Sequence, residues 1–224
     1  MKKLIYIIVL TCLVLSCKTS KTTLPIVNDE ESSAEFILDK RDNNRYQTIV
    51  IGERQWFKEN LRYKSPKSKC FKNKRANCDQ VGRLYPSSEL DLLCPEGWRV
   101  PTIADWNELK HQNEADSITA LLDTISWYNP IGHTNQSGLS LRASGHQMGK
   151  RLFLGKETAV SIWLNQINKF DEYYHVHLYG GKGISFPLSG YHTNEVFHAH
   201  PIEDLENRRL SVRCICEADK QIVN

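Results

Sequence analysis

Apolar and polar residues alternate along much of the chain beyond residue 45. A period of two is typical of antiparallel strands that bury one face of a sheet. The C-terminal half contains four such segments, at residues 139–143, 160–165, 174–179 and 210–215. Nearer the N-terminus, the β-branched and aromatic residues of 46–51 predict a strand, and Gly52 predicts a hairpin turn that returns the chain through 55–57.

Two segments carry the signals of helices. Thr102 opens a capping box that Asp105 completes three residues later. Trp106 and Leu109 then fall on one face of the predicted helix. A second helix is predicted at 117–126, where the apolar residues at helical spacing are Ile118, Leu121, Leu122 and Ile125. Strands combined with two helices and long loops predict an α+β fold with mixed or antiparallel strands.

The chain begins with two lysines and a short apolar run, which together are typical of a secretory signal. The run is too short for a membrane-spanning helix, which needs about 20 apolar residues. Residues 14–17 (VLSC) resemble the lipobox of bacterial lipoproteins. This resemblance implies that a signal of residues 1–16 is removed and that Cys17 is acylated, with palmitate among the expected acyl chains. A plain signal peptide with an incidental cysteine is the alternative.

The remaining N-terminal residues indicate how the chain is organised. Residues 17–35 are mostly polar and lack apolar periodicity, so we expect a lipidated flexible tether. A folded domain is expected at 36–218, followed by a tail at 219–224. Lys18 follows the cysteine, which by resemblance to lipoprotein sorting favours the outer membrane and leaves open which face the domain occupies. The expected membrane contact is the N-terminal lipid.

Composition narrows the class of protein. Of 224 residues, 40% are hydrophobic and 25% are charged, which excludes wholesale disorder, collagen and a multi-span membrane protein. The net charge of +3 is too small to indicate a nucleic-acid binder, and no nucleic acid is expected as a partner. One segment is nevertheless rich in basic residues, namely Lys64, Lys67, Lys69, Lys72, Lys74 and Arg75. It predicts either a solvated loop or a surface that attracts an anionic glycan, lipid headgroups or an acidic partner.

Five motifs occur in order along the chain. They lie at residues 45–61 (RYQTIVIG and QWFKENL), 82–85 (GRLY), 94–109 (CPEGWRVPT, then DW and L), 137–146 (SGL and ASGH) and 210–214 (LSVRC). Together they resemble the Fibrobacter succinogenes major paralogous domain family, which is frequent in envelope proteins of Bacteroidetes. The resemblance implies a C-type-lectin-like fold, although a fold does not by itself give a function. Phe57, His146 and the segment 162–165 depart from the family pattern.

The motifs supply a set of residues that we expect to be structural: Trp56, Asn60, Gly97, Trp98, Trp106 and Arg213. Gly97 allows a tight turn, and Trp98 and Trp106 are expected to be core aromatics beneath the helix. Arg213 is expected to join a polar network by pairing with Glu59 or with an aspartate, because buried charges are normally paired.

Once the signal is removed, the cysteines divide into an anchor, two expected disulfides and one remaining thiol. A bridge between Cys94 and Cys214 closes a loop of about 120 residues, which in the chain-entropy model contributes roughly 4–5 kcal/mol. Cys70 and Cys78 are eight residues apart and are expected to close their own loop. Cys216 has the same strand parity as Cys214, so either of these two is the remaining thiol.

Five of the eight histidines fall late in the chain: His175, His177, His192, His198 and His200. The His-x-His pairs indicate metal binding only weakly, because no carboxylate follows at a fixed spacing. We therefore favour a polar, solvent-facing strand and loop, and we expect neither a metal nor a cofactor. No Ser-His-Asp set, carboxylate dyad or phosphate loop occurs at a recognisable spacing, so we expect no catalytic residue and no enzymatic activity.

The lipobox, the disulfide candidates and the long loops favour one function. We expect an envelope-anchored binding or adhesion module that recognises glycan or protein. The alternative is a structural or assembly subunit of an envelope complex. An enzyme is the less favoured class because the sequence lacks readable catalytic motifs.

Overall fold

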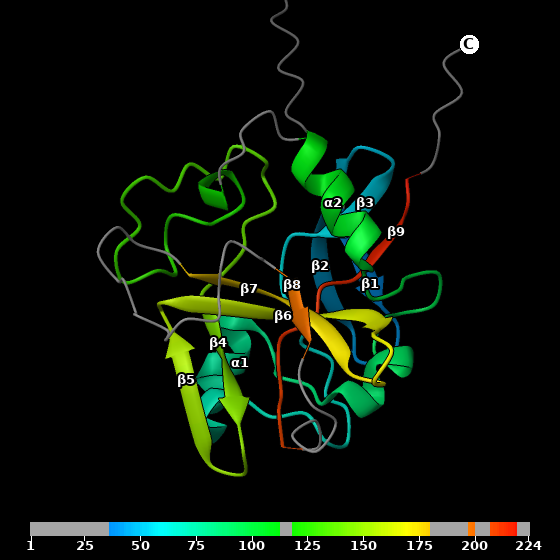
Figure 1. The fold of residues 1–224 in the computed structure, drawn as a ribbon. Coiled ribbons are helices and arrows are strands. Elements are labelled where there is room, and N and C mark those ends of the chain that lie inside the picture. Colours follow the sequence, from blue (N-terminus) through cyan, green and yellow to red (C-terminus); the bar gives the residue numbers. More distant parts are fainter. Residues whose placement is uncertain (1–35, 113–117, 180–196, 200–206, 219–224) are drawn as a thin grey trace, which may run out of the picture. The chain divides into compact units, whose positions relative to one another are not determined.

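The computed structural model describes residues 36–112, 118–179, 197–199 and 207–218 (Figure 1). These ranges belong to one compact unit that begins at Ala34. The predicted signal and tether, with Cys17, lie outside the described residues, and so does the tail at 219–224. The lipid anchor and the domain boundaries therefore stay predictions.

The first sheet joins the beginning of the domain to its end. Its strands are β1 (Phe36–Asp39), β2 (Asn44–Ile51), β3 (Arg54–Phe57) and β9 (Ile215–Glu217). They pair in the order β1-β2-β3-β9, and every pair is antiparallel. At the β2–β3 turn, Gly52 has a φ of +61°, which glycine adopts at little cost. The predicted hairpin is confirmed, and Figure 1 shows its blue strands beside the red β9.

The second sheet is mixed. Its strands are β4 (Ser144–Met148), β5 (Leu152–Lys156), β6 (Ala159–Ile167), β7 (Tyr173–Tyr179) and β8 (Phe197–Ala199). The order is β5-β4-β6-β7-β8, and β4 runs parallel to β6. β6 and β7 confirm two of the predicted strands. Residues 159–164 of β6 are all buried, so the expectation of a single buried face is wrong for this strand, which is central and covered on both sides.

The described residues contain two α-helices, α1 (Arg75–Val81) and α2 (Ile103–Gln112), and three 3-10 helices, η1 (Phe71–Asn73), η2 (Ser87–Leu92) and η3 (Ile118–Ala120). The predicted capping box is present at α2, where Asp105 Oδ2 accepts the backbone N–H of Thr102 at 2.7 Å. α1 was not predicted; it begins at Arg75, the last residue of the basic segment. None of these helices combines the length and the apolar character that a bilayer-spanning helix needs.

Of the predicted helix at 117–126, only Ile118–Ala120 are helical, as the 3-10 helix η3, and the prediction is wrong for residues 121–126. After η3 the chain turns and bends, and Leu122 forms a β-bridge with Leu141. Leu121 is also buried, and its carbonyl oxygen accepts the N–H of Leu141 at 2.8 Å. Ile125 is 89% exposed and does not face the core. Apolar residues buried by pairing with a second segment mimic helical spacing, because periodicity over a short run is ambiguous.

The segments 139–143 and 210–215 do not form the full strands predicted. Leu210 bridges Tyr85, Ser211 bridges Ile162 of β6, and only the end of the second segment enters a sheet, as β9. This segment passes from the second sheet to the first, so each of its pairings is short. The alternation was therefore a sign of burial and not of a continuous strand.

Two clusters of buried side chains form the core. Trp56 and Trp106 belong to the first, where their rings meet edge to face at 5.4 Å between centroids. Tyr85 and Trp163 belong to the second, and Trp163 Nε1 donates to the carbonyl oxygen of Tyr85 at 2.8 Å. Two sheets, a few short helices and long connections confirm the predicted α+β class.

Candidate functional site

Arg213 is fully buried, and its guanidinium makes four hydrogen bonds. Nε donates to Asn60 Oδ1 at 2.9 Å. Nη1 donates to the carbonyl oxygens of Phe57 and Leu139, and Nη2 donates to that of Ser140, at 2.7–2.9 Å. Burial lowers the pKa of Arg213 to about 9, so the group remains charged at neutral pH. The neutral oxygens replace water around this charge.

The expectation that Arg213 pairs with Glu59 or with an aspartate is wrong. Glu59 Oε2 instead accepts the backbone N–H of Gln47 at 2.9 Å. Among the described residues, Arg213 takes part in no ion pair. Arg213 and Asn60 thus connect the segment that precedes β9 to β3 and to the 139–140 loop through hydrogen bonds alone. Their role is therefore structural.

The other motif residues also lie in structural surroundings. Trp56 and Trp106 are buried, whereas Trp98 is half-buried with its ring 4.6 Å from that of Phe57. Gly97 has a φ of +80°, and a Cβ added there meets no atom within 4 Å. The backbone conformation, and not a lack of space, therefore favours glycine at this turn.

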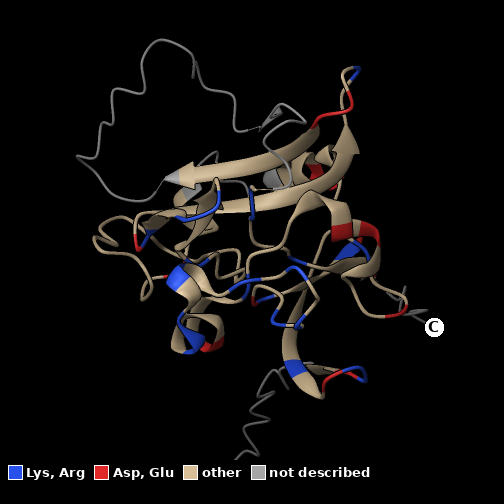
Figure 2. Ribbon diagram, turned by 90° about the horizontal axis from the view of Figure 1, so that it is seen from below, with Lys and Arg blue, Asp and Glu red and all other residues tan. Residues whose placement is uncertain are grey.

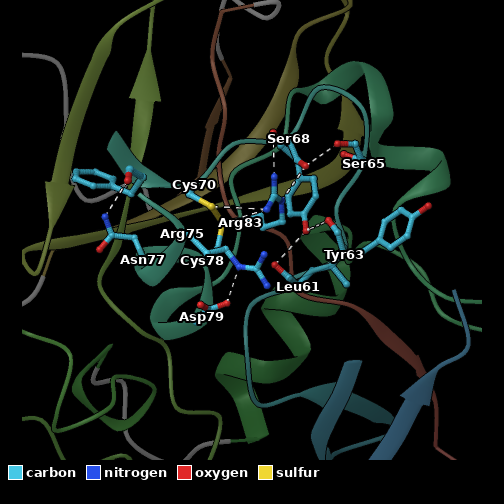
Figure 3. The surroundings of a disulfide bond; sticks show 12 residues. Leu61, Tyr63, Ser65, Ser68, Cys70, Arg75, Asn77, Cys78, Asp79 and Arg83 are labelled. Atoms are coloured by element: carbon cyan, nitrogen blue, oxygen red, sulfur yellow. Dashed lines mark hydrogen bonds and ion pairs between the residues drawn. A yellow bond between two sulfur atoms is a disulfide. The ribbon is translucent and has the colours of Figure 1, made fainter. Parts of the chain in front are cut away.

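Both expected disulfides are present. Cys94 is bonded to Cys214, and Cys70 to Cys78. Cys216 is therefore the remaining thiol, and its Sγ lies 3.5 Å from Gln55 Oε1. Figure 3 shows the Cys70–Cys78 bond, which closes the segment that contains η1 and the first half of α1.

The late histidines are less exposed than expected where the structure describes them. His175 on β7 is buried, with its ring 5.9 Å from that of Trp163, so the expectation of a solvent-facing strand is wrong there. Ser161 Oγ lies 2.5 Å from His177 Nδ1 and 3.2 Å from His146 Nδ1. Burial lowers the pKa of His146 to about 4. The described residues contain no group of three or more His, Cys, Asp or Glu side chains able to hold a metal ion. The side chains of His192, His198 and His200 lie outside the described residues.

A solvent-open cleft of about 550 Å³ lies where the end of α1 meets the 123–128 loop and the β5–β6 turn. Its floor includes the buried residues Asp123 and Trp127. Asp123 Oδ1 accepts the N–H of Ser126 at 3.0 Å and its hydroxyl at 2.7 Å. Trp127 Nε1 donates to the carbonyl oxygen of Leu141 at 3.1 Å. These bonds fix the loop, so the floor is preformed.

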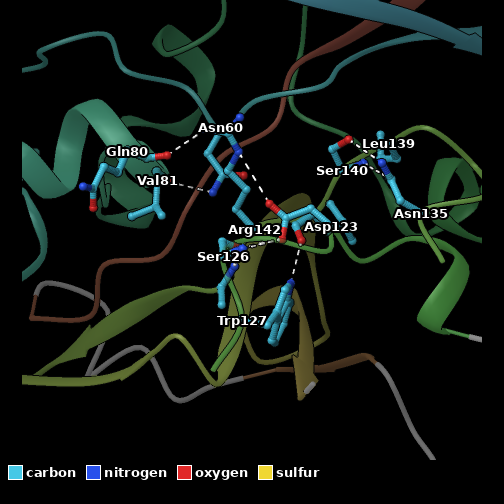
Figure 4. A network of polar contacts seen from close by, with 12 residues as sticks. Asn60, Gln80, Val81, Asp123, Ser126, Trp127, Asn135, Leu139, Ser140 and Arg142 are labelled. Carbon is cyan, nitrogen blue, oxygen red and sulfur yellow. Dashed lines mark hydrogen bonds and ion pairs between the residues drawn. The ribbon is translucent and has the colours of Figure 1, made fainter. Parts of the chain in front are cut away.

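The walls of the cleft carry both signs of charge. Arg142 Nη1 donates to the carbonyl oxygen of Gln80 at 2.7 Å, and Arg142 Nε lies 3.8 Å from Asp123 Oδ2 (Figure 4). At the β5–β6 turn, Lys156 Nζ pairs with Oε1 of the next residue, Glu157, at 3.2 Å. A guanidinium, an ammonium and two carboxylates therefore border the same space, which suits a ligand with both donors and acceptors.

The rim is apolar and faces water. Tyr128 is 79% exposed and Ile125 is 89% exposed, and both line the cleft. The backbone N–H of Tyr128 donates to the carbonyl oxygen of Glu157 at 2.7 Å, which ties the rim to the β5–β6 turn. Exposed aromatic and aliphatic side chains beside convergent polar groups are typical of a binding surface.

None of the cleft residues was among the predicted site residues. The available signal was the run SWYNP at 126–130, in which two aromatic residues precede Asn129 and Pro130. Asparagine and proline favour a turn, so the aromatic residues belong to a loop and not to the predicted helix. The other walls come from Arg142 and from the β5–β6 turn, which no local pattern connects with this loop.

The comparisons with known proteins give one match. No curated protein and no solved structure matches the chain significantly. The family model of the Fibrobacter succinogenes major domain matches residues 49–216, three quarters of the 224-residue chain. The matched range contains both disulfides, Arg213 and all residues of the cleft. This chain therefore belongs to the Fibrobacter succinogenes major domain family.

Proposed function

We propose that this protein is a lipoprotein of the bacterial cell envelope whose domain is a non-catalytic binding module. The lipid on Cys17 holds it at the outer membrane, and the 123–128 cleft recognises a glycan or a protein. The proposal of an anchor is supported by the signal-like residues 1–16 and by the lipobox-like VLSC that ends at Cys17.

The observation that carries the binding role is the mixture of groups around the cleft. The loop that forms it is held by hydrogen bonds between Asp123 and Ser126 and from Trp127 to Leu141, so little conformational entropy is lost when a ligand binds. Tyr128 and Ile125 offer apolar surface that water covers in the unliganded protein. Burial of such surface favours association by about 25 cal/mol per Å² before binding costs are subtracted.

A binding screen tests this proposal. The mature protein is presented to an array of neutral and acidic glycans and to solubilised envelope proteins, and the affinity of each hit is measured for Tyr128→Ala. Loss of the exposed ring is expected to weaken binding at least tenfold, since aromatic anchors dominate binding surfaces. Phe170→Ala is the matched control, because Phe170 is 65% exposed but does not line the cleft.

Three results contradict the proposal. Equal binding by the Tyr128 and Phe170 variants places the site elsewhere on the molecule. Absence of any hit argues against a binding module. Purification of the protein in fixed stoichiometry with envelope proteins, unaffected by Tyr128→Ala, favours the alternative of a structural or assembly subunit.

A further inference from the structure

A second recess, of about 430 Å³, lies next to the cleft and shares Lys156 and Glu157 with it. The other side of this recess is built by the basic segment, with Lys72 and Lys74 among its lining residues. Figure 2 shows Lys and Arg positions in blue on α1 and in the segment before it. One side chain pair, Lys156 and Glu157, therefore separates a mixed-charge cleft from a recess lined by two further lysines.

A disulfide and several hydrogen bonds fix the backbone that forms the basic side of this recess. The Cys70–Cys78 disulfide closes the segment, and Arg83 Nη1 lies 3.6 and 3.4 Å from the two sulfur atoms (Figure 3). Asn77 Nδ2 donates to the carbonyl oxygen of Phe71 at 2.8 Å. These contacts hold η1 against α1, while the side chains of Lys72 and Lys74 stay exposed to solvent.

The backbone at Lys72 supports a functional reason for this rigidity. Lys72 and the next residue, Asn73, have φ values of +51° and +56°, the left-handed region that L-residues other than glycine adopt at a cost. Such conformations persist only where the surrounding structure imposes them, and they gather at functional sites. The ring of Phe71, buried below, meets that of Phe153 edge to face at 5.4 Å between centroids.

The residues that line the recess carry a net positive charge. Three lysines and one glutamate line it, which gives a net formal charge of +2. Glu157 pairs with Lys156, and Arg75 just outside pairs with Asp79 at 3.2 Å. In the described part of the chain, no carboxylate lies within ion-pair distance of Lys72 or Lys74. The ammonium groups of Lys72 and Lys74, two residues apart on a fixed backbone, thus face the solvent.

The geometry points to an acidic oligosaccharide as the ligand of this surface. An uncharged sugar ring occupies the cleft beside Tyr128, and a carboxylate or sulfate of a neighbouring unit lies in the recess at Lys72 and Lys74. This inference rests on the binding function proposed above and names the ligand class. Charge-assisted hydrogen bonds from ammonium groups hold the anionic group, while the carboxylates of Asp123 and Glu157 accept hydrogen bonds from sugar hydroxyls.

The mixture of charges favours a saccharide over other anions. A phosphate-rich membrane surface or an acidic peptide brings anionic groups to both halves of the surface, but in the cleft Arg142 and Lys156 already pair with Asp123 and Glu157 and leave no net positive charge for a second anion. An acidic saccharide separates its charged groups by neutral, hydroxyl-bearing rings. It therefore satisfies the lysines of the recess without placing an anion against the carboxylates of the cleft.

Titration calorimetry with the mature protein at 0.15 M salt tests the inference. The probes are an oligogalacturonate hexamer and a heparin-derived hexasaccharide, with maltohexaose as the neutral saccharide, a pentaglutamate peptide and phosphatidylglycerol vesicles. At least one acidic saccharide is expected to bind ten times more tightly than maltohexaose. The double variant Lys72→Gln/Lys74→Gln is expected to remove this preference, because each lost ammonium group removes a charge-assisted hydrogen bond.

The matched control is Lys64→Gln/Lys67→Gln, which removes the same charge from two exposed lysines of the segment that do not line the recess. It is expected to change the affinity less than twofold, and circular dichroism melts check that both variants fold. Equal losses of affinity for the acidic saccharide in the two double variants overturn the inference, since they indicate unspecific attraction between the basic segment and any anion. Tighter binding of the peptide or of the vesicles overturns it as well. If maltohexaose or a protein binds through Tyr128 with no effect of the lysines, the ligand class is wrong while the proposed function stands.

Discussion

At the scale of single residues, Arg213 joins segments that are far apart in the chain. Its donors reach β3, Asn60 and the 139–140 loop, and every acceptor is an uncharged oxygen. A planar guanidinium with five N–H groups fits this arrangement, whereas an ammonium group cannot reach all four acceptors at once. The residue acts as a structural cross-link made of hydrogen bonds.

We predict that Arg213→Lys lowers the free energy of unfolding by about 3 kcal/mol, because buried acceptors lose their donors. Urea denaturation followed by tryptophan fluorescence measures the change. Arg151→Lys, at an exposed position, is the control and is expected to leave the midpoint unchanged. Similar midpoints for both variants contradict the role given to Arg213.

At the scale of elements, the N-terminus of α2 depends on Asp105. This buried carboxylate accepts hydrogen bonds from Arg99, Arg54 and the backbone and hydroxyl of Thr102. Burial by itself raises the pKa of Asp105. The hydrogen bonds from Arg99, Thr102 and Arg54 together lower the pKa by more than burial raises it, so it lies well below its usual range. The helix cap and the β3 end of the first sheet are thereby coupled.

This coupling predicts a dependence of stability on pH. A carboxylate whose pKa is lower in the folded state stabilises the fold above its unfolded pKa of about 4, and that contribution is lost as the pH falls. Asp105→Asn is expected to cost about 2 kcal/mol at pH 7 and to flatten the loss of stability between pH 5 and pH 2. Denaturation midpoints across this range measure it, and parallel pH profiles for the two proteins contradict it.

Elements with local signals were predictable, and elements defined by distant partners were not. The β2–β3 hairpin has its turn glycine and α2 has its capping box, so both were predicted correctly. The 121–125 segment resembled a helix because Leu121 and Leu122 are buried by Leu141, twenty residues away in sequence. The cleft has the same origin: its loop carries a local turn signal, but Arg142 and the β5–β6 turn reach it only through the fold.

At the scale of the whole molecule, the two disulfides differ in reach. Cys94–Cys214 has a sequence separation of 120, whereas Cys70–Cys78 has a separation of 8. In the chain-entropy model the long loop is worth about 5 kcal/mol and the short loop about 2.5 kcal/mol. Cys94→Ser is therefore expected to lower the melting temperature more than Cys70→Ser, as measured by calorimetry under oxidising conditions. Equal melting temperatures for the two variants contradict this ranking.

The proposed position of the protein at the membrane depends on Cys17. We predict that Cys17→Ala releases the protein from the membrane fraction, because the acylated thiol is the proposed attachment. Cell fractionation with intact mass spectrometry measures both the location and the lipid. A variant that stays with the outer membrane and still carries acyl chains contradicts the lipoprotein proposal.

The last described segment has a consequence for how the protein is made. Leu210, Ser211 and Ile215 pair with residues of both halves of the fold, and Cys214 closes the long disulfide. These residues follow in sequence every segment that they pair with, so neither sheet has its full set of neighbours until residues 210–217 have been made. Completion of both sheets therefore depends on contacts that are distant in sequence, and such contacts make folding slow. A newly made molecule therefore spends a period with both sheets incomplete and with the partner of Cys94 not yet in place.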